Sequence, residues 1–367
     1  MFKIKKQLSK LYLSSVLGNL SLTGAWVAIL AARGYSLVEI GIAETVFHMT
    51  SLIFEIPSGI LADVFGRKKM LIVSSVMRMI GNIVMILSNG LPMVCLSLAF
   101  HALSYNFASG SDEALAYDSL KIAEMESRFE KYCSNQLVIY RLCSGISTLC
   151  AGFALFIGYR IAYGTDLITG TIQILLLASL CEVYAGNENA ENRHRGLAEI
   201  GNELIGCFKE SISFLKEARN AIGFMLCNSF VGAVDILLLF FLQAKLQGKL
   251  PQGWLGFALL FMEMGGIIGS KLILQFPKLK YRSVFVITIL LVFTGVLAEH
   301  SSIWPVMTLG GFLAAVGDDA IQVRTNAILQ DMFPSEQRAT LTSVESFSFS
   351  VIMIVLSPLA GIVFTYW

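Results

Sequence analysis

The chain has 367 residues, of which 55% are apolar and only 14% charged, and its formal net charge is +1. A soluble domain carries about 25% charged residues, so this composition excludes an ordinary soluble protein. The near-neutral balance excludes a protein that binds nucleic acid through a basic surface.

Blocks of apolar residues recur along the chain, and each is long enough to cross a bilayer, which takes roughly 20 helical residues. The short alternating segments that are typical of an outer-membrane barrel are absent. The blocks lie near residues 11–32, 37–58, 70–88, 91–117, 134–158, 166–185, 220–243, 253–275, 283–300, 303–326 and 339–366. The sequence therefore predicts an all-α, polytopic membrane protein with eleven spans.

The loops between these blocks differ in charge. Every second loop is rich in lysine and arginine, and the positive-inside rule places these loops in the cytoplasm together with the N-terminus. Their cations are Arg67, Lys68, Lys69, Lys121, Arg128, Lys131, Arg193, Arg195, Lys209, Lys216, Arg219, Lys278, Lys280 and Arg282. We therefore expect a multi-pass protein of the cell membrane (the inner or cytoplasmic membrane) with a cytoplasmic N-terminus.

The longest polar stretch, 186–219, follows the sixth block. A short repeat supports a division there, because a glycine, two acids and an alanine recur in the fourth and tenth blocks. We predict a six-helix bundle over 1–185, a cytoplasmic linker with an amphipathic segment over 186–219, and a bundle of five detected spans over 220–367. An ordinary connecting loop would explain the polar stretch equally well on its own.

A motif between the second and third blocks is the most specific signal. It reads Gly59-Ile60-Leu61-Ala62-Asp63-Val64-Phe65-Gly66-Arg67-Lys68. It resembles the G-x-L-A-D-x-x-G-R-[KR] signature of the major facilitator superfamily. The segments Ser109–Leu120 and Pro334–Ala339 resemble the bacterial drug-efflux-like branch. The resemblance implies a fold of two six-helix halves that rock about a central cavity.

Each position of this motif has a physical role. Gly59 and Gly66 allow a tight turn and a close backbone approach, because they lack a side chain. Asp63 can face the positive N-terminal end of a neighbouring helix, and Arg67 can bridge to an acid on the next hairpin, for which Asp118 is the candidate. The resemblance implies a cytoplasmic latch between the halves, made of Gly59, Asp63, Gly66, Arg67, Lys68 and Asp118. The alternative is that the cations only obey the positive-inside rule and that Asp63 only caps a helix.

Ionisable residues inside the apolar blocks each cost roughly 2.5–3.5 kcal/mol on insertion scales, so each needs a function or a partner. Glu44 lies one helical turn from His48 on the same face, whereas Asp235 and Glu263 have no adjacent partner in the sequence. We expect these four residues to bind substrate or protons, and packing alone is an equal alternative for His48. The other charges are expected to form intramembrane pairs, namely Asp112 or Glu113 with Arg141 and Asp318 or Asp319 with Arg324, and Arg78 belongs to the same group.

Two features depart from the resemblance. The fifth block lacks the Gly-Pro pair that drug/proton antiporters of the superfamily often carry there, which weakens the efflux assignment. The superfamily has twelve spans, and 339–367 is too short for two crossings, so we expect the twelfth helix to be absent.

We expect a secondary active transporter that exports small amphipathic or cationic compounds with proton coupling, by alternating access. Its partners are then the substrate, protons and the lipid bilayer, and it is a monomer without a cofactor, a metal or enzymatic activity. The alternatives are an importer or facilitator of a sugar, a peptide or another metabolite, or an inactive truncated carrier. A membrane-embedded enzyme is disfavoured, because no HExxH or Ser/His/Asp arrangement is present.

Overall fold

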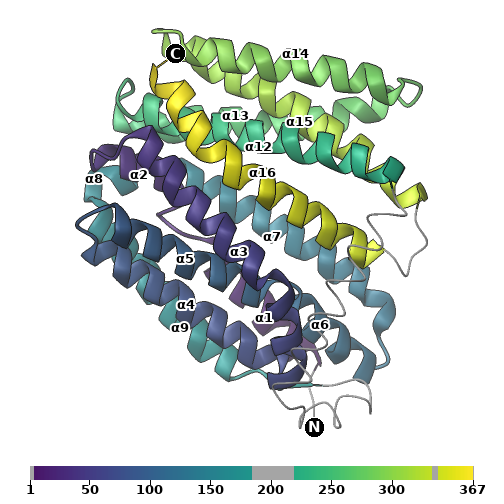
Figure 1. The fold of residues 1–367 in the computed structure, drawn as a ribbon. Helices are drawn as coiled ribbons and strands as arrows, with labels where there is room; N and C mark the ends of the chain where they lie inside the picture. The colour runs from purple at the N-terminus through teal and green to yellow at the C-terminus, as the bar shows by residue number, and fades with distance from the viewer. Residues whose placement is uncertain (1–3, 184–218, 333–337, 367) are drawn as a thin grey trace. The chain divides into compact units, whose positions relative to one another are not determined.

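The computed structural model describes residues 4–183, 219–332 and 338–366, and the regular structure in these ranges is helical (Figure 1). The helices are α1 (Ile4–Asn19), α2 (Trp26–Ala32), α3 (Leu37–Phe65), α4 (Arg67–Leu87), α5 (Leu91–Ala108), α6 (Ser111–Ile122), α7 (Phe129–Leu149), α8 (Ala151–Ile157), α9 (Tyr159–Ala178), α12 (Arg219–Gln247), α13 (Gln252–Leu272), α14 (Tyr281–Glu299), α15 (Trp304–Met332) and α16 (Arg338–Tyr366). Two 3-10 helices, η1 (Glu126–Arg128) and η3 (Ile273–Gln275), precede α7 and follow α13. The predicted all-α class is therefore confirmed.

Most of these helices have the length and composition of membrane spans. Among the described residues, nine helical segments are long and apolar enough to cross a bilayer. Helices α7 and α8 make a tenth candidate, because they pass the same test together but are bent by 48°. The hydrocarbon core of a membrane requires that backbone polar groups are paired internally, and a helix does this. The protein is therefore a multi-pass membrane protein.

The first predicted span, 11–32, is interrupted, which corrects the expectation of one continuous helix. Residues 20–25 separate α1 from α2. In this break the Leu22 N–H donates to Asp166 Oδ1 at 3.3 Å, and Thr23 Oγ1 donates to Asp166 Oδ2 at 2.5 Å. The short polar side chains of the break compete with helical hydrogen bonds, and a carboxylate from α9 takes up donors that a continuous helix would pair internally.

The chain divides into two compact units. Unit 1 comprises Met1–Gly24, Thr50–Ser147 and Ile157–Lys209, and unit 2 comprises Ala25–Met49, Thr148–Phe156 and Glu210–Trp367. Two of their boundaries fall beside the breaks between α1 and α2 and between α7 and α8, and another falls within α3, between Met49 and Thr50. The predicted linker 186–219 lies outside the described residues except for Arg219, so the division into 1–185, 186–219 and 220–367 stays a prediction.

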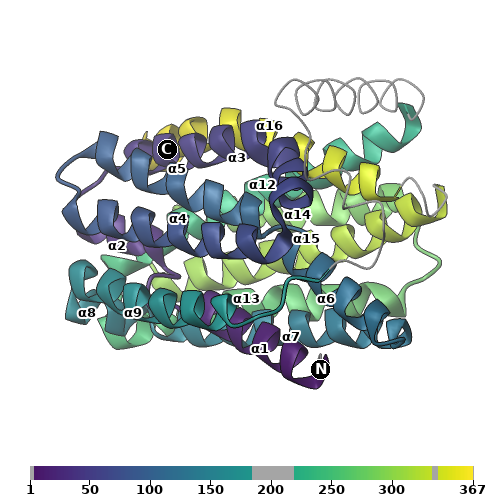
Figure 2. The same cartoon turned by 90° about the horizontal axis from the view of Figure 1, so that it is seen from below.

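In unit 1, α4 lies between α5 and α9 (Figures 1 and 2). Ser97 Oγ of α5 donates to the carbonyl oxygen of Gly81 on α4 at 2.8 Å. A second hydrogen bond joins the same helices, from Ser74 Oγ to the carbonyl oxygen of Ser104 at 2.7 Å. Small and hydroxylated residues therefore let these helices approach closely, as is common where helices meet in a membrane.

In unit 2, α13 and α14 both pack against α15, and α12 contacts α2, α14, α15 and α16. The crossing of α13 and α15 is close, because a Cβ on Gly265 or Gly269 would collide with the carbonyl oxygens of Phe312 and Val316. These two glycines therefore serve packing inside the unit.

Candidate functional site

The turn between α3 and α4 positions the first charged cluster. Gly66 lies between the two helices with φ 103° and ψ 140°. This backbone conformation favours glycine, because a Cβ would clash there, and the expected tight turn is present at this residue. Gly59, by contrast, lies inside the continuous helix α3, and a Cβ on it would meet no described atom within 4 Å. Gly59 therefore makes neither the turn nor the close approach that the motif predicted.

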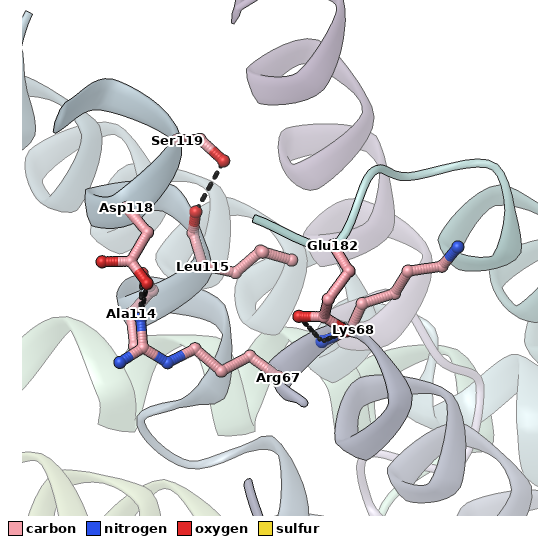
Figure 3. Close-up of polar contacts among 7 residues, drawn as sticks. All are labelled: Arg67, Lys68, Ala114, Leu115, Asp118, Ser119 and Glu182. Carbon is pink, nitrogen blue, oxygen red and sulfur yellow. Dashed lines mark hydrogen bonds and ion pairs between the residues drawn. The ribbon is translucent and has the colours of Figure 1, made fainter. Parts of the chain in front are cut away.

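Arg67 and Asp118 are in contact in unit 1 (Figure 3). Arg67 Nη1 pairs with Asp118 Oδ2 and also donates to the carbonyl oxygen of Ala114 at 2.9 Å. Both acceptors belong to α6 and lie one turn apart on the same face. The side chains of Arg67 and Asp118 are only 19% and 10% exposed, so solvent screens this pair less than a surface pair. The predicted contact is confirmed, whereas the side chain of Asp63 lies outside the described residues.

A third charged residue, Glu182, also belongs to this cluster. It lies outside the sequence motif, so the motif did not predict it. Its two carboxylate oxygens accept the Lys68 backbone N–H, at 3.2 and 3.1 Å, in the first turn of α4 (Figure 3). Lys68 Nζ donates to the carbonyl oxygen of Ala178, the last residue of α9, at 2.7 Å. An anion at a helix N-terminus and a cation at a C-terminus both interact favourably with the helix dipoles. The cluster thus joins the start of α4 to α6 and to the end of α9.

Replacing Glu182 by alanine is expected to loosen the first turn of α4. Losing an acceptor at a helix N-terminus costs about 1 kcal/mol, which corresponds to roughly fivefold faster hydrogen exchange of the local amides. Hydrogen–deuterium exchange of a peptide that covers the start of α4 measures this change. Glu126→Ala removes an exposed acid from the same unit and is the matched control, which should leave that peptide unchanged. Equal exchange in Glu182→Ala and wild type would rule out the capping role.

Glu44 and His48 form a pair on α3, as their spacing predicts. His48 Nε2 lies 3.2 Å from Glu44 Oε1, and each side chain is 9% exposed. The His48 ring meets the ring of Phe349 on α16 edge-on, with 5.6 Å between centroids. Its Nδ1 has no hydrogen-bond partner among the described residues. A histidine beside a carboxylate can hold a proton between the two groups, which is the chemistry expected of this pair.

Three acidic residues of unit 2 lie near one another on α12 and α15. Asp318 projects toward α12, since a Cβ on Gly232 would lie 3.5 Å from Asp318 Oδ1. Asp319 projects toward α13, where a Cβ on Gly266 would lie 2.5 Å from Asp319 Oδ2. Asp235, one turn after Gly232, is close enough to interact electrostatically with both acids. We call Asp235, Asp318 and Asp319 the acidic cluster.

Arg324 does not neutralise the acidic cluster, which corrects its predicted pairing with Asp318 or Asp319. Its guanidinium donates instead to the carbonyl oxygens of Phe276 at 2.7 Å and Pro277 at 3.1 Å. An α-helix turns by about 100° per residue, so residues five or six positions apart do not share a face. The predicted pair fails for this geometric reason.

Glu263 and Glu345 accept hydrogen bonds from neutral side chains in unit 2. Thr148 Oγ1 donates to Glu263 Oε1 at 2.8 Å, and Asn228 Nδ2 donates to Glu345 Oε1 at the same distance of 2.8 Å. Polar neighbours therefore hold both acids in a defined orientation.

Asp112 is held by neutral donors and not by Arg141, which corrects the other predicted pair. Tyr132 Oη and Gln136 Nε2 donate to Asp112 Oδ2 at 2.7 and 2.6 Å. These two donors lie one turn apart on α7, whereas Arg141 lies five residues further along, on another face of the helix. Arg141 and Glu113 are exposed.

Arg78 of α4 binds polar groups of α1 and α9. Its Nη1 donates to the carbonyl oxygen of Gly18 at 2.6 Å, and its Nη2 donates to Gln173 Oε1. Gln173 Nε2 in turn donates to the carbonyl oxygen of Ser14 at 2.9 Å. Gly18 is in the last turn of α1, where carbonyl groups without helical partners favour a cation. Arg78 therefore stabilises the end of α1, beside the break in the first predicted span.

One buried ion pair of unit 2 escaped prediction. Glu299, at the end of α14, is 1% exposed and pairs with Lys245 of α12. His300 Nδ1 lies 3.3 Å from Glu299 Oε2. Both partners lie at the ends of apolar blocks, where charges are normally solvated, so nothing in the sequence distinguishes them from loop residues.

Comparison with known proteins agrees with this architecture. A family profile described as the Major Facilitator Superfamily matches residues 11–298. No curated protein matches the chain. Similar solved structures include the nucleoside transporter NupG, with 14% identity, 100% of this chain and 92% of that chain covered and a TM-score of 0.70. A D-xylose–proton symporter is 12% identical, with 97% and 89% of the two chains covered and a TM-score of 0.72.

A third similar structure is a bacterial homologue of the human lysosomal transporter Spinster in an inward-facing, unoccupied conformation. It is 15% identical, with 97% and 81% of the two chains covered and a TM-score of 0.70. At such low identities the likeness shows the fold alone. The family profile covers most of the chain, and its members are membrane transporters that bind small molecules and are not enzymes. The chain belongs to the Major Facilitator Superfamily.

Proposed function

We propose that this protein is a secondary active transporter of the cell membrane that exports small amphipathic or cationic compounds in exchange for protons. In this proposal the N-terminus and the cation-rich loops face the cytoplasm. The observation that carries it is the convergence of Asp235, Asp318 and Asp319 within the membrane-spanning helices of unit 2.

An acidic cluster inside a membrane has a chemical consequence. Like charges repel strongly in a region of low dielectric, and each buried charge also has a desolvation cost. A proton or a cationic substrate that enters the cluster reduces both. The cluster therefore favours cations over anions as ligands, and a proton competes with the substrate for it.

Exchange follows from this competition. On the outer side a proton binds to the cluster and displaces the substrate, and on the cytoplasmic side the substrate displaces the proton. Each rocking movement then carries one of the two species, which couples export to the proton gradient. The Glu44–His48 pair and Glu263 supply further positions for a proton or a substrate. The Arg67–Asp118 contact lies within unit 1, and in this proposal it fixes the turn between α3 and α4 in one state and breaks in the other.

An importer or facilitator of a neutral metabolite is the second candidate. Asn228 Oδ1 and Gln243 Oε1 are buried acceptors without a hydrogen-bond partner among the described residues. Amide groups of this kind suit the hydroxyl groups of a sugar or a nucleoside. A nucleoside transporter and a D-xylose–proton symporter share the fold, and a fold does not by itself choose between export and import.

Expression in an efflux-deficient bacterium tests the proposal. We expect the wild-type chain to raise the tolerance of the cells to toxic lipophilic cations, and an uncoupler of the proton gradient to remove the difference. Asp63→Asn should abolish the resistance, because the motif loses its carboxylate charge. Growth across a panel of cationic, neutral and anionic toxic compounds is the measurement.

The control is an immunoblot of the membrane fraction, which must show equal amounts of both chains. Uptake of labelled sugars and nucleosides is measured in the same cells. Resistance equal to that of the empty vector, together with raised uptake of a sugar or nucleoside, would overturn export and support import.

A further inference from the structure

A cavity in unit 2 opens between two membrane spans and is separate from the acidic residues discussed above. Helices α13 and α14 both pack on α15, and the cavity lies between them with α15 as its floor. Its volume is about 320 Å³, within the range of about 300–1,000 Å³ that is typical of small-molecule sites. The walls are almost wholly apolar, with Ile273, Ile287, Leu291 and Val316 among the residues that line them.

One end of this cavity is lined by the loop between α13 and α14. The loop that joins α13 to α14 contributes Phe276 and Leu279 to the lining. The candidate spans on either side of this loop end at Gln275 and begin at Tyr281, so the loop lies at the depth of the lipid headgroups. The cavity therefore extends from the apolar spans to a loop at the level of the headgroups.

Four exposed cations lie in this loop and at the helix ends that it joins. Between Lys271 and Arg282 the chain also carries Lys278 and Lys280, and it contains no aspartate or glutamate in this stretch. None of the four has an ion-pair partner among the residues that the structure describes. Lys278 and Lys280 flank Leu279, which lines the cavity, so both residues lie next to the lining.

Residues of α15 hold the loop between α13 and α14 in place. Arg324 of α15 donates to the carbonyl oxygens of Phe276 and Pro277 at 2.7 and 3.1 Å. The Tyr281 hydroxyl forms a hydrogen bond of 3.1 Å with Thr325 Oγ1 of the same helix. The cations are therefore presented on an anchored loop beside a formed cavity.

We propose that this cavity binds an anionic phospholipid, with an acyl chain between α13 and α14 and the phosphate headgroup on the cations of residues 271–282. Charge complementarity selects the headgroup, because a zwitterionic lipid offers no net charge to four unpaired cations. A basic pocket between transmembrane helices at the headgroup level is the kind of site that binds anionic lipids. The bound lipid fills the gap between two spans that do not pack on each other.

Lipid binding to the purified protein tests this inference. The protein in a neutral detergent is titrated with phosphatidylglycerol or with phosphatidylcholine of the same acyl chains, and retention is measured by native mass spectrometry. We expect selective retention of phosphatidylglycerol and a higher melting temperature with this lipid. The triple variant Lys278→Gln, Lys280→Gln and Arg282→Gln should weaken its binding by on the order of 100-fold, at about 1 kcal/mol for each cation.

A matched triple variant is the control for charge. Lys121→Gln, Arg128→Gln and Lys131→Gln remove three exposed cations from the end of α6, from η1 and from the start of α7, a stretch that also contains acids, and should leave binding unchanged. Ala320→Phe keeps all cations and fills the cavity, so it should also abolish retention. Glycerol 3-phosphate tests the contribution of the phosphate headgroup alone. Because it has no acyl chain, it should neither be retained nor stabilise the protein.

Three results would overturn the inference. The first is equal retention of the two lipids by the wild-type protein, and the second is unchanged lipid selectivity in the variant at residues 278–282. The third is full retention of phosphatidylglycerol by an Ala320→Phe protein that size-exclusion chromatography shows to be folded. Stabilisation by glycerol 3-phosphate alone would show a phosphate site without a lipid pocket. Because the cation variant changes only exposed residues, the selectivity arm does not depend on whether Ala320→Phe folds.

Discussion

Replacing Asp235 by asparagine is expected to reduce proton-driven transport of cations to the level of membranes that lack the protein. Asparagine has nearly the shape of aspartate, so packing between α12 and α15 is kept. It cannot ionise, and the acidic cluster then loses the charge that lets a proton compete with the substrate. Because Asp235 interacts electrostatically with Asp318 and Asp319, the change alters the whole cluster and not one isolated group.

Inverted membrane vesicles provide the measurement. An imposed proton gradient drives uptake of a fluorescent lipophilic cation, and the initial rate is compared between wild type and Asp235→Asn. Release of protons when the substrate is added to the detergent-purified protein is a second readout, and it should disappear in the variant. Glu113→Gln neutralises an exposed acid of unit 1 and should keep both signals. Wild-type rates in Asp235→Asn would remove the acidic cluster from the mechanism, and Glu263→Gln would then be the next variant to measure.

Asp118→Asn is expected to stop transport and to destabilise unit 1. The change leaves Arg67, which is only 19% exposed, without its carboxylate partner. Breaking a fully buried pair costs about 3–5 kcal/mol, and partial exposure lowers the expectation to about 2 kcal/mol here. For a chain of this length the melting temperature should fall by about 3 °C, since the entropy of unfolding grows with the number of residues.

A double-mutant cycle separates the pair from its surroundings. Arg67→Gln should have a similar effect, and the double variant Arg67→Gln with Asp118→Asn should be more stable than the sum of the single effects predicts, because neither charge is left alone. Lys121→Gln, which removes an exposed cation at the end of α6, is the control and should not change the melting temperature. Additive single effects would show that the two side chains do not interact in the membrane-embedded protein.

The features that depend on residues close together in the sequence were predicted correctly. Apolar blocks such as 37–58 and 283–300 appear as α3 and α14, because a segment in a bilayer must pair its own backbone groups and therefore forms a helix. The Glu44–His48 pair could also be predicted from the sequence, since residues four apart meet on any straight helix. The Arg67–Asp118 contact was predicted from the motif and is present in the structure.

The failures share a different cause. Asp112 was matched with Arg141 and the acids at 318 and 319 with Arg324, yet Asp112 meets Tyr132 and Gln136, and Arg324 meets the loop after α13. A pairing rule based on distance along the chain ignores which face of the helix each side chain occupies. The break between α1 and α2 was missed for a related reason, because the carboxylate that stabilises it, Asp166, comes from a distant helix.

The sequence by itself therefore determined the all-α membrane architecture, the family and the turn at Gly66, since each depends on residues that are adjacent in the chain. Only the tertiary structure decided which charges come together: Glu182 at the start of α4, the buried Lys245–Glu299 pair, and the proximity of Asp235 to two further acids. The physical reason is that a span can form with many rotations and depths, and all of them bury similar apolar area. Packing against the other helices selects one, and that choice sets every contact between side chains of different spans.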